Sequence, residues 1–213
     1  MILRARGPFV LARDFYARPT LQVARELLGK VLVRATPEGR AAGIIVEAEA
    51  YIGEDDPACH AAHGLTPRNQ PLYGAPGRAY VYFNYGVHYL VNAVTERAGM
   101  PAAVLIRALE PAEGIDLMRE RRGRWRDGRD RPLADLCRGP GNLTRALGIG
   151  PAQNRADLTR RSAAGLWIED RGIATGEVAW TARIGIRVGT DRPWRCYLAG
   201  NPCVSGSRRR DTP

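Results

Sequence analysis

Lysine is nearly absent from this chain: among its 213 residues Lys30 is the only one, and almost all of the positive charge is arginine. A mechanism that needs a lysine Schiff base therefore has one candidate residue. The chain also lacks any run of about 18 uncharged apolar residues, and its first residues lack the apolar segment and cleavage site of a signal peptide. We therefore expect a cytoplasmic protein with no membrane partner.

Cysteine is scarce as well. The four cysteines are scattered and form no C-x-x-C pair, which argues against a zinc ribbon and against a dense disulfide framework. His60 and His63 lie close to Cys59, but their spacing fits no standard zinc pattern. We therefore expect free thiols, no metal site and no cofactor.

The charge is strongly one-sided. A formal net charge of +10 indicates a polyanionic partner, because phosphates attract clustered arginines through counterion release and long-range steering. No basic amphipathic helix with a broad apolar face is evident, which favours nucleic acid over a membrane surface. Residues 119–131 hold seven arginines around Trp125, and we expect the end of a surface helix and a mobile loop there.

The chain shows no repeat and no linker, so we expect one domain over residues 1–205, followed by a polar, disordered tail at 206–213. Hydrophobic periodicity predicts helices at 20–28, from 111 to about 122, and at 139–147. Strands are expected at 31–33, 43–51, 79–83, 89–95, 102–109, 166–168, 178–188 and 195–198.

Two acids lie on one face of the strand predicted at 43–51. Strict alternation places Ile45, Glu47, Glu49 and Tyr51 on that face. The two glutamates are then about 6–7 Å apart, which matches the carboxylate separation of inverting glycosidases, about 6.5–9.5 Å. For an arbitrary Glu-x-Glu, one ion pair and one solvated carboxylate is the more ordinary interpretation.

An arginine interrupts the strand predicted at 102–109. Alternation puts Arg107 on one face with Ala103, Leu105 and Leu109. Because a buried charge needs a partner, we expect a carboxylate beside Arg107.

Tyrosines surround the long irregular segment at 52–77. Tyr51, Tyr82 and Tyr85 could each stack on a base, a contact worth about 1–3 kcal/mol, whereas ordinary strand composition accounts for Tyr80 and Tyr89. Tyr85 stands at the tip of a predicted hairpin, where its own strands offer little to pack against.

Several short blocks follow one another in a characteristic order along the chain. They are Glu47-Ala48-Glu49-Ala50-Tyr51, Asp56 with His60, Thr66-Pro67-Arg68-Asn69, Tyr80-Val81-Tyr82, Tyr85-Gly86-Val87-His88, Asn92 and Leu105-Ile106-Arg107-Ala108-Leu109-Glu110-Pro111. Together these blocks resemble the alkyladenine (3-methyladenine) DNA glycosylase family. The resemblance covers residues 27–205, weakens after 147, and implies an α+β fold: a single compact domain with a curved, mostly antiparallel sheet, surrounding helices and a protruding β-hairpin.

The resemblance implies a monofunctional base-excision-repair enzyme. It would act as a monomer on duplex DNA, flip out N-alkylated or deaminated purines and hydrolyse the N-glycosidic bond. Glu49 corresponds to the general base that activates water, Arg107 to the cation that keeps this carboxylate ionised, and Ile184 to a backbone carbonyl at the water site. The scarcity of lysine agrees with a water nucleophile, so we expect no lyase activity.

The resemblance also assigns the residues that bind DNA. Tyr51, His60 and Tyr82 would enclose the flipped base, and Asn92 would disfavour guanine by crowding its exocyclic amine. On the DNA side, Tyr85 would fill the gap left in the duplex, with contacts from Arg68, Val87 and His88.

Four positions depart from the family pattern. Asn142 replaces a lysine that is common after Gly-Pro-Gly, which bears on one phosphate contact, and Ala48, Cys196 and Cys203 replace a threonine and two aromatics. Two other functions stay open at this point. One is a non-catalytic nucleic-acid-binding module, and the other is an inverting carbohydrate hydrolase with Glu47 as acid and Glu49 as base.

Overall fold

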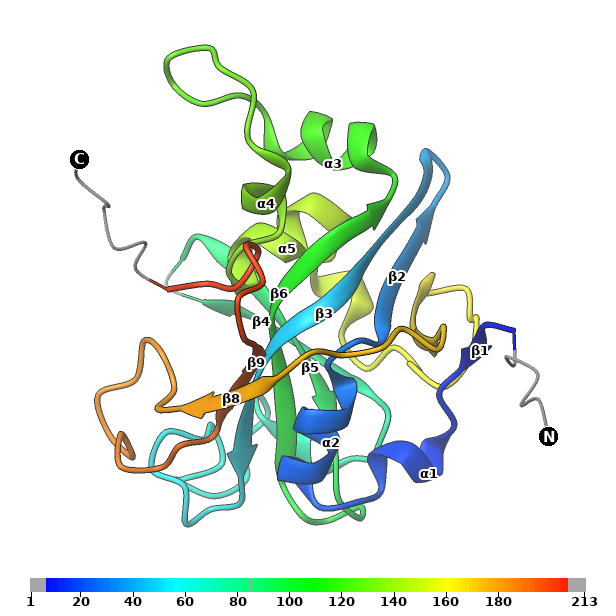
Figure 1. Ribbon diagram of the computed structural model, residues 1–213. Helices are drawn as coiled ribbons and strands as arrows, with labels where there is room; N and C mark the ends of the chain where they lie inside the picture. The colour runs from blue at the N-terminus through cyan, green and yellow to red at the C-terminus, as the bar shows by residue number, and fades with distance from the viewer. Residues whose placement is uncertain (1–6, 85, 207–213) are drawn as a thin grey trace, which may run out of the picture.

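The long strand β3 (Gly39–Ile52) is the element around which the sheet is built. The computed structural model describes residues 7–84 and 86–206, and every strand pairing in this part of the chain is antiparallel (Figure 1). The strand order is β1 (Phe9–Val10), β7 (Leu166–Asp170), β2 (Val31–Thr36), β3, β6 (Ala102–Glu113), β5 (His88–Val94) and β4 (Ala79–Asn84).

One edge of β3 is shared between two partners. Its first half pairs with β2, and its second half pairs with β9 (Arg195–Leu198) at Glu47–Glu49, while β6 pairs along the other edge. The strand β8 (Val178–Thr181) extends the sheet from β9. The middle of β3 is therefore covered by backbone on both edges, and its side chains are buried.

Three irregularities interrupt the pairing of β3 with β6, and two of them lie side by side in the middle of the strands. Val46 has no opposite residue on β6, and Arg107 has none on β3, because the register moves from Ile45 opposite Leu109, through Glu47 opposite Ala108, to Ala48 opposite Ile106. Bulges of this kind re-aim side chains and are common beside active sites.

Because of the bulges, the predicted positions of Ile45 and Leu109 on their strand faces were wrong. Ile45 packs in the main core with Ala48 rather than lying on the face of Glu47 and Glu49. Leu109 joins the same core instead of sharing a face with Arg107. Strict alternation failed in both strands because each contains an extra residue at this point.

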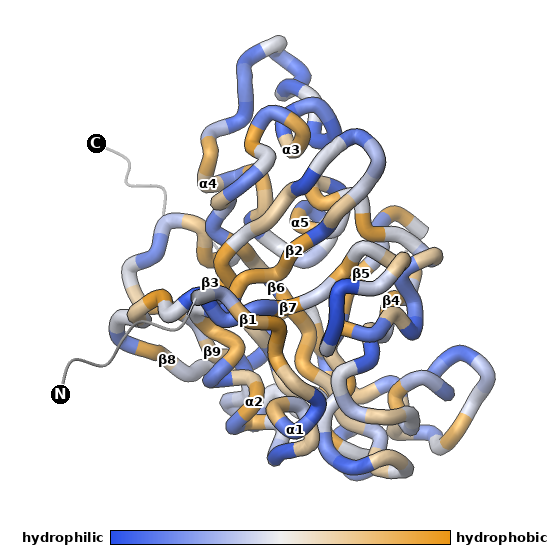
Figure 2. Tube along the Cα trace, turned by 90° about the vertical axis from the view of Figure 1, so that its right-hand side faces the viewer, coloured by the Kyte–Doolittle hydropathy of each residue, from blue (hydrophilic) through white to orange (hydrophobic). Residues whose placement is uncertain are grey.

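Helices α2 (Thr20–Leu27) and α5 (Pro140–Leu147) supply much of the main hydrophobic core, in which their apolar residues meet those of β3 and β6. Figure 2 shows hydrophobic segments concentrated along the central strands and a hydrophilic loop between α3 (Ile115–Arg122) and α4 (Leu133–Leu136). The remaining helical segments are α1 (Arg13–Tyr16) and two short 3-10 helices, Gln70–Tyr73 and Pro151–Gln153.

The α+β architecture, the single compact domain and the curved antiparallel sheet are as predicted. Several boundaries were wrong: β3 already starts at Gly39, and β6 continues to Glu113. The helix expected after Pro111 begins only at Ile115, because Pro111 still belongs to β6 and pairs with Gly43. The strand expected at 178–188 ends at Thr181, because the following backbone and side chains turn inward to polar partners in the site described below.

Strands β4 and β5 form the predicted antiparallel hairpin, with Asn84 opposite His88. Tyr85 at its tip lies outside the described residues, as do residues 207–213 of the expected disordered tail. Whether this hairpin enters DNA therefore remains a prediction.

The turn between β6 and α3 depends on a glycine. Gly114 is left-handed (φ 69°, ψ 38°), and a Cβ there would lie 2.3 Å from the Arg40 carbonyl oxygen. We expect Gly114→Ala to lower the free energy of unfolding by about 2–5 kcal/mol, because strain of about 1–2 kcal/mol is added to overpacking of about 1–3 kcal/mol. Urea denaturation measures this loss.

A matched control is Gly148→Ala. Gly148 has the same backbone conformation (φ 65°, ψ 41°), but its Cβ would meet only the flexible Arg121 guanidinium, at 3.1 Å. This variant should lose only the strain component, about 1–2 kcal/mol. Equal losses in the two variants would show that the contact with Arg40 is unimportant.

Candidate active site

A pocket of about 320 Å³ opens between β3, the irregular segment 52–77, the β4–β5 hairpin and the loop after β8. This volume lies in the range of small-molecule sites, about 300–1,000 Å³. The predicted catalytic and base-binding residues are brought together here, since the lining includes Tyr51, His60, Tyr82, Asn92, Arg107 and Ile184.

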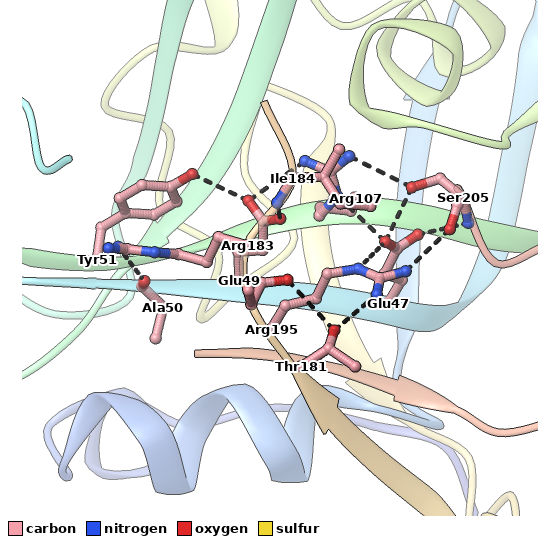
Figure 3. A network of polar contacts seen from close by, with 11 residues as sticks. Glu47, Glu49, Ala50, Tyr51, Arg107, Thr181, Arg183, Ile184, Arg195 and Ser205 are labelled. Carbon is pink, nitrogen blue, oxygen red and sulfur yellow. Dashed lines mark hydrogen bonds and ion pairs between the residues drawn. The ribbon is translucent and has the colours of Figure 1, made fainter. Parts of the chain in front are cut away.

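Glu49 lies directly behind three of these lining residues and is itself fully buried. Its Oε1 accepts a hydrogen bond from the Ile184 backbone amide at 2.7 Å. Its Oε2 accepts one from the Tyr51 hydroxyl at 2.9 Å and pairs with Arg107 Nη1 at 3.2 Å (Figure 3). A carboxylate has about four acceptor positions, so these contacts leave capacity on Oε1 for one more donor.

The surroundings of Glu49 act on its proton affinity in opposite directions. Burial has the largest effect and raises the pKa of Glu49, and the nearby charge of Glu47 raises it further. Arg107, the Ile184 amide and the Tyr51 hydroxyl lower this pKa, but the net shift is upward. Burial and the charge of Glu49 also raise the pKa of Tyr51, so its hydroxyl keeps its proton and stays a donor. Glu49 is therefore a stronger base than a solvated glutamate.

Glu47 is equally buried but does not line the pocket. It accepts hydrogen bonds from Arg107 Nε at 3.1 Å, Arg195 Nε at 2.6 Å, and the Ser205 amide and hydroxyl at 2.7 and 2.8 Å. Arg107 thus contacts both glutamates, as Figure 3 shows. The prediction of a carboxylate beside Arg107 is confirmed.

Aromatic side chains form one wall of the pocket. His60 Nδ1 lies 2.9 Å from the Tyr80 hydroxyl, and the His60 ring meets the edge of Tyr82 with centroids 4.4 Å apart. Partial desolvation and then the charge of Arg68 lower the pKa of His60, which favours the neutral imidazole. Asn92 donates its amide to the Tyr80 carbonyl at 3.0 Å, which orients it in the pocket.

Comparison with known proteins identifies the family of this chain. A family model described as methylpurine-DNA glycosylase (MPG) matches residues 14–202. The chain belongs to the methylpurine-DNA glycosylase family. It is therefore a DNA repair glycosylase, an enzyme that acts on DNA and hydrolyses N-glycosyl bonds, and the family predicted from its motifs is confirmed.

Its relatives match over nearly their whole length. A protein of Methanocella arvoryzae named for 3-methyladenine DNA glycosylase is 50% identical over 199 residues, which cover 92% of this chain and 96% of the relative. A protein of the same name from Chlorobaculum parvum is 46% identical over 93% of this chain. Another, from Rubrobacter xylanophilus, is 50% identical over 87% of this chain. Each match covers 91% of the relative.

A second buried ion pair of the glycosylase was not predicted. Arg183 is held by both carboxylate oxygens of Asp56, at 2.5 and 2.7 Å, and it also donates to the Ala50 carbonyl at 3.0 Å. Its guanidinium lies 4.6 Å from the centre of the Tyr51 ring. The pair ties the segment 52–77 to the loop that carries Ile184. The position of Arg183 inside a predicted strand, between Ala182 and Ile184, was the signal available in the sequence.

The predicted DNA-side residues Arg68, Val87 and His88 of the glycosylase are exposed and do not line the pocket. Arg68 is exposed, with its guanidinium 5.7 Å from the Tyr82 ring, and Val87 is 66% exposed. His88 is exposed and packs so closely on Gly141 that a Cβ there would lie 2.5 Å from the His88 ring. The start of α5 therefore contacts the hairpin next to its turn.

Lys30, the single lysine, pairs with Asp170 at the start of β2 and does not line the pocket. Within residues 7–84 and 86–206, no group of three or more histidine, cysteine or acidic residues is placed to hold a metal ion. No helix in this part of the glycosylase is long and apolar enough to cross a membrane.

The Asp56–Arg183 pair makes a testable contribution to stability. Asp56→Asn should lower the free energy of unfolding by about 3–5 kcal/mol, because it leaves Arg183 buried without its counter-charge. Chemical denaturation measures this change. Asp55→Asn is the matched control, since the neighbouring side chain is exposed and only its backbone carbonyl accepts a bond, from Arg192. A similar loss in both variants would contradict the assignment.

Proposed function

We propose that this glycosylase flips damaged purines, N-alkylated or deaminated, out of duplex DNA and hydrolyses the N-glycosidic bond to leave an abasic site. The observation that carries the proposal is the position of Glu49, a buried carboxylate held by three donors directly behind an aromatic pocket. The names of the relatives point to 3-methyladenine as one such base.

In the proposed reaction Glu49 is the general base. Its remaining acceptor position on Oε1 takes a proton from a water molecule, whose oxygen attacks the anomeric carbon while the bond to the purine breaks. The ionised carboxylate also stabilises the oxocarbenium-like transition state. Arg107 keeps Glu49 ionised and fixes its orientation. The backbone carbonyl of Ile184 would hold the water from the side opposite to its amide.

A cationic N-alkylated purine is a good leaving group without further protonation, so one base is sufficient for such lesions. Tyr51 and Tyr82 would stack on the flipped base, at about 1–3 kcal/mol per stacked ring. His60 would contact its edge as a neutral imidazole, and Asn92 would disfavour guanine through steric conflict with the exocyclic amine.

On the DNA side, we propose that Tyr85 fills the space vacated in the duplex, which offsets the cost of unstacking. Arg68, Val87 and His88 would contact the surrounding strand, and the net charge of +10 would draw the protein to phosphates. One copy of the chain carries all of these residues, which supports a monomer.

The hydrogen bonds of Glu47 argue against an inverting carbohydrate hydrolase. Such an enzyme would need Glu47 as a proton-carrying acid. Two arginines and Ser205 already donate four hydrogen bonds to it, and it does not line the pocket. The second carboxylate therefore has no route to a leaving group.

The proposal predicts that Glu49→Gln reduces base release by about 10²–10⁴-fold, the usual contribution of a general base. Binding to duplex oligonucleotides with one defined lesion should be retained, because glutamine keeps the shape of the site. The control Glu38→Gln removes an exposed glutamate from the β2–β3 turn and should change neither property. Unaltered base release by Glu49→Gln would refute the assignment.

Tyr85→Ser, in contrast, should weaken both the binding of lesion-containing duplex and the flipping of the base.

A second prediction concerns the nucleophile. Because water is proposed to attack, borohydride should trap no covalent complex between the protein and damaged DNA, and the abasic product should keep an intact backbone. Lys30→Arg should release bases at the wild-type rate, since Lys30 is paired with Asp170 outside the pocket. A trapped adduct would show that a protein amine attacks instead.

A further inference from the structure

We propose that Glu47 is a positioning residue for base release, which orients Arg107 against Glu49. The inference rests on the proposed function of Glu49. It starts from the observation that the second glutamate is as deeply buried as the first, yet faces away from the pocket toward two arginines and Ser205.

The geometry of Arg107 provides the first argument. Its Nε donates to Glu47 at 3.1 Å, and its Nη1 lies 3.2 Å from Glu49 Oε2. A guanidinium is planar and rigid, so the bond at Nε determines where Nη1 points. Its Nη2 reaches the Ser205 hydroxyl at 3.3 Å, and this hydroxyl in turn donates to Glu47. Without Glu47 the guanidinium would lose the contact that aims it.

Charge balance provides the second argument. Two carboxylates that shared Arg107 alone would leave one excess negative charge in a buried site. Arg195 supplies the second positive charge at 2.6 Å from Glu47, and it is itself anchored by Thr181 Oγ1 at 2.8 Å and the Ser205 carbonyl at 2.9 Å. The four charged groups then sum to zero, so Arg107 can serve Glu49.

The third argument is that the elements converge on Glu47 from far apart in the chain. Arg107 comes from the bulge in β6, Arg195 from β9, and Ser205 from the segment after β9 (Figure 3). Ser205, near the end of the described residues, is thus linked to Glu49 through Arg107, both directly and by way of Glu47. Arg107 lines the pocket, whereas Glu47, Arg195 and Ser205 do not, so these three act through Arg107 and not on the substrate.

The test compares Glu47→Gln with wild type on a duplex that carries one cationic N-methylated purine. This leaving group needs no protonation, so the acid limb of the single-turnover pH profile reports on Glu49; spontaneous base loss is subtracted at each pH. The plateau rate of Glu47→Gln should fall by about 10- to 100-fold, the effect of a small misplacement at a reacting centre. Affinity for the lesion should change by less than about twofold, since Glu47 makes no pocket contact.

The direction of the pH shift separates positioning from a purely structural role. The charge of Glu47 raises the pKa of Glu49. Glutamine still offers Arg107 Nε an acceptor, though a weaker one, so Arg107 stays near Glu49 while the charge of Glu47 is lost. The pKa of Glu49 should therefore fall, and the acid limb should move to lower pH. Glu169→Gln is the matched control. Glu169 is a buried glutamate on β7 that binds Arg40, Arg171 and Trp167 outside the pocket. It should lose stability without a change in plateau rate or acid limb.

Two further variants keep the test valid if Glu47→Gln folds poorly. Ser205→Ala removes a neutral bridge between Glu47 and Arg107, so the plateau rate should fall about three- to tenfold with an unmoved acid limb. Glu47→Asp keeps the negative charge, so the acid limb of its pH profile should also stay at the wild-type position. Wild-type rates in Glu47→Gln and Ser205→Ala, or a limb shift in Glu169→Gln, would overturn the inference. Absence of base release by wild type would instead refute the proposed function.

Discussion

The contact of one arginine with two buried carboxylates is the interaction on which the site depends. Arg107 can reach Glu47 and Glu49 together because it is the unpaired residue of a bulge, opposite a strand that has its own extra residue at Val46. In regular strands Arg107 would have continued an alternating face that includes Leu109. The bulges take Ile45 and Leu109 into the hydrophobic core and leave the three charged side chains together.

Burying these charges requires a nearly complete set of partners, since an unpaired buried ion costs several kcal/mol. The fold supplies them from separate segments: Arg195 and Ser205 for Glu47, and Tyr51, Arg107 and the Ile184 amide for Glu49. The same need explains why the chain leaves the sheet after Thr181. Its backbone and Arg183 bind polar groups on and beside β3 in place of a continued strand ladder.

The pocket wall and the buried carboxylate share side chains. The Tyr51 ring lines the pocket, its hydroxyl binds Glu49, and Arg183 lies against its ring. Displacement of this ring would therefore disturb the carboxylate as well. In the proposed function, such coupling would connect the seating of a base with the orientation of the carboxylate behind it.

The sequence alone determined the family, the fold class and the residues that gather at the pocket, because ordered motifs such as Glu47 to Tyr51 and Leu105 to Pro111 carry that information locally. It also implied that Arg107 needs a carboxylate. Only the tertiary structure decided that Arg107 has two, that Glu47 is closed off from the pocket by Arg195 and Ser205, and that Asp56 holds Arg183. These contacts join residues as many as 158 positions apart, and they depend on bulges that a two-residue periodicity cannot reveal.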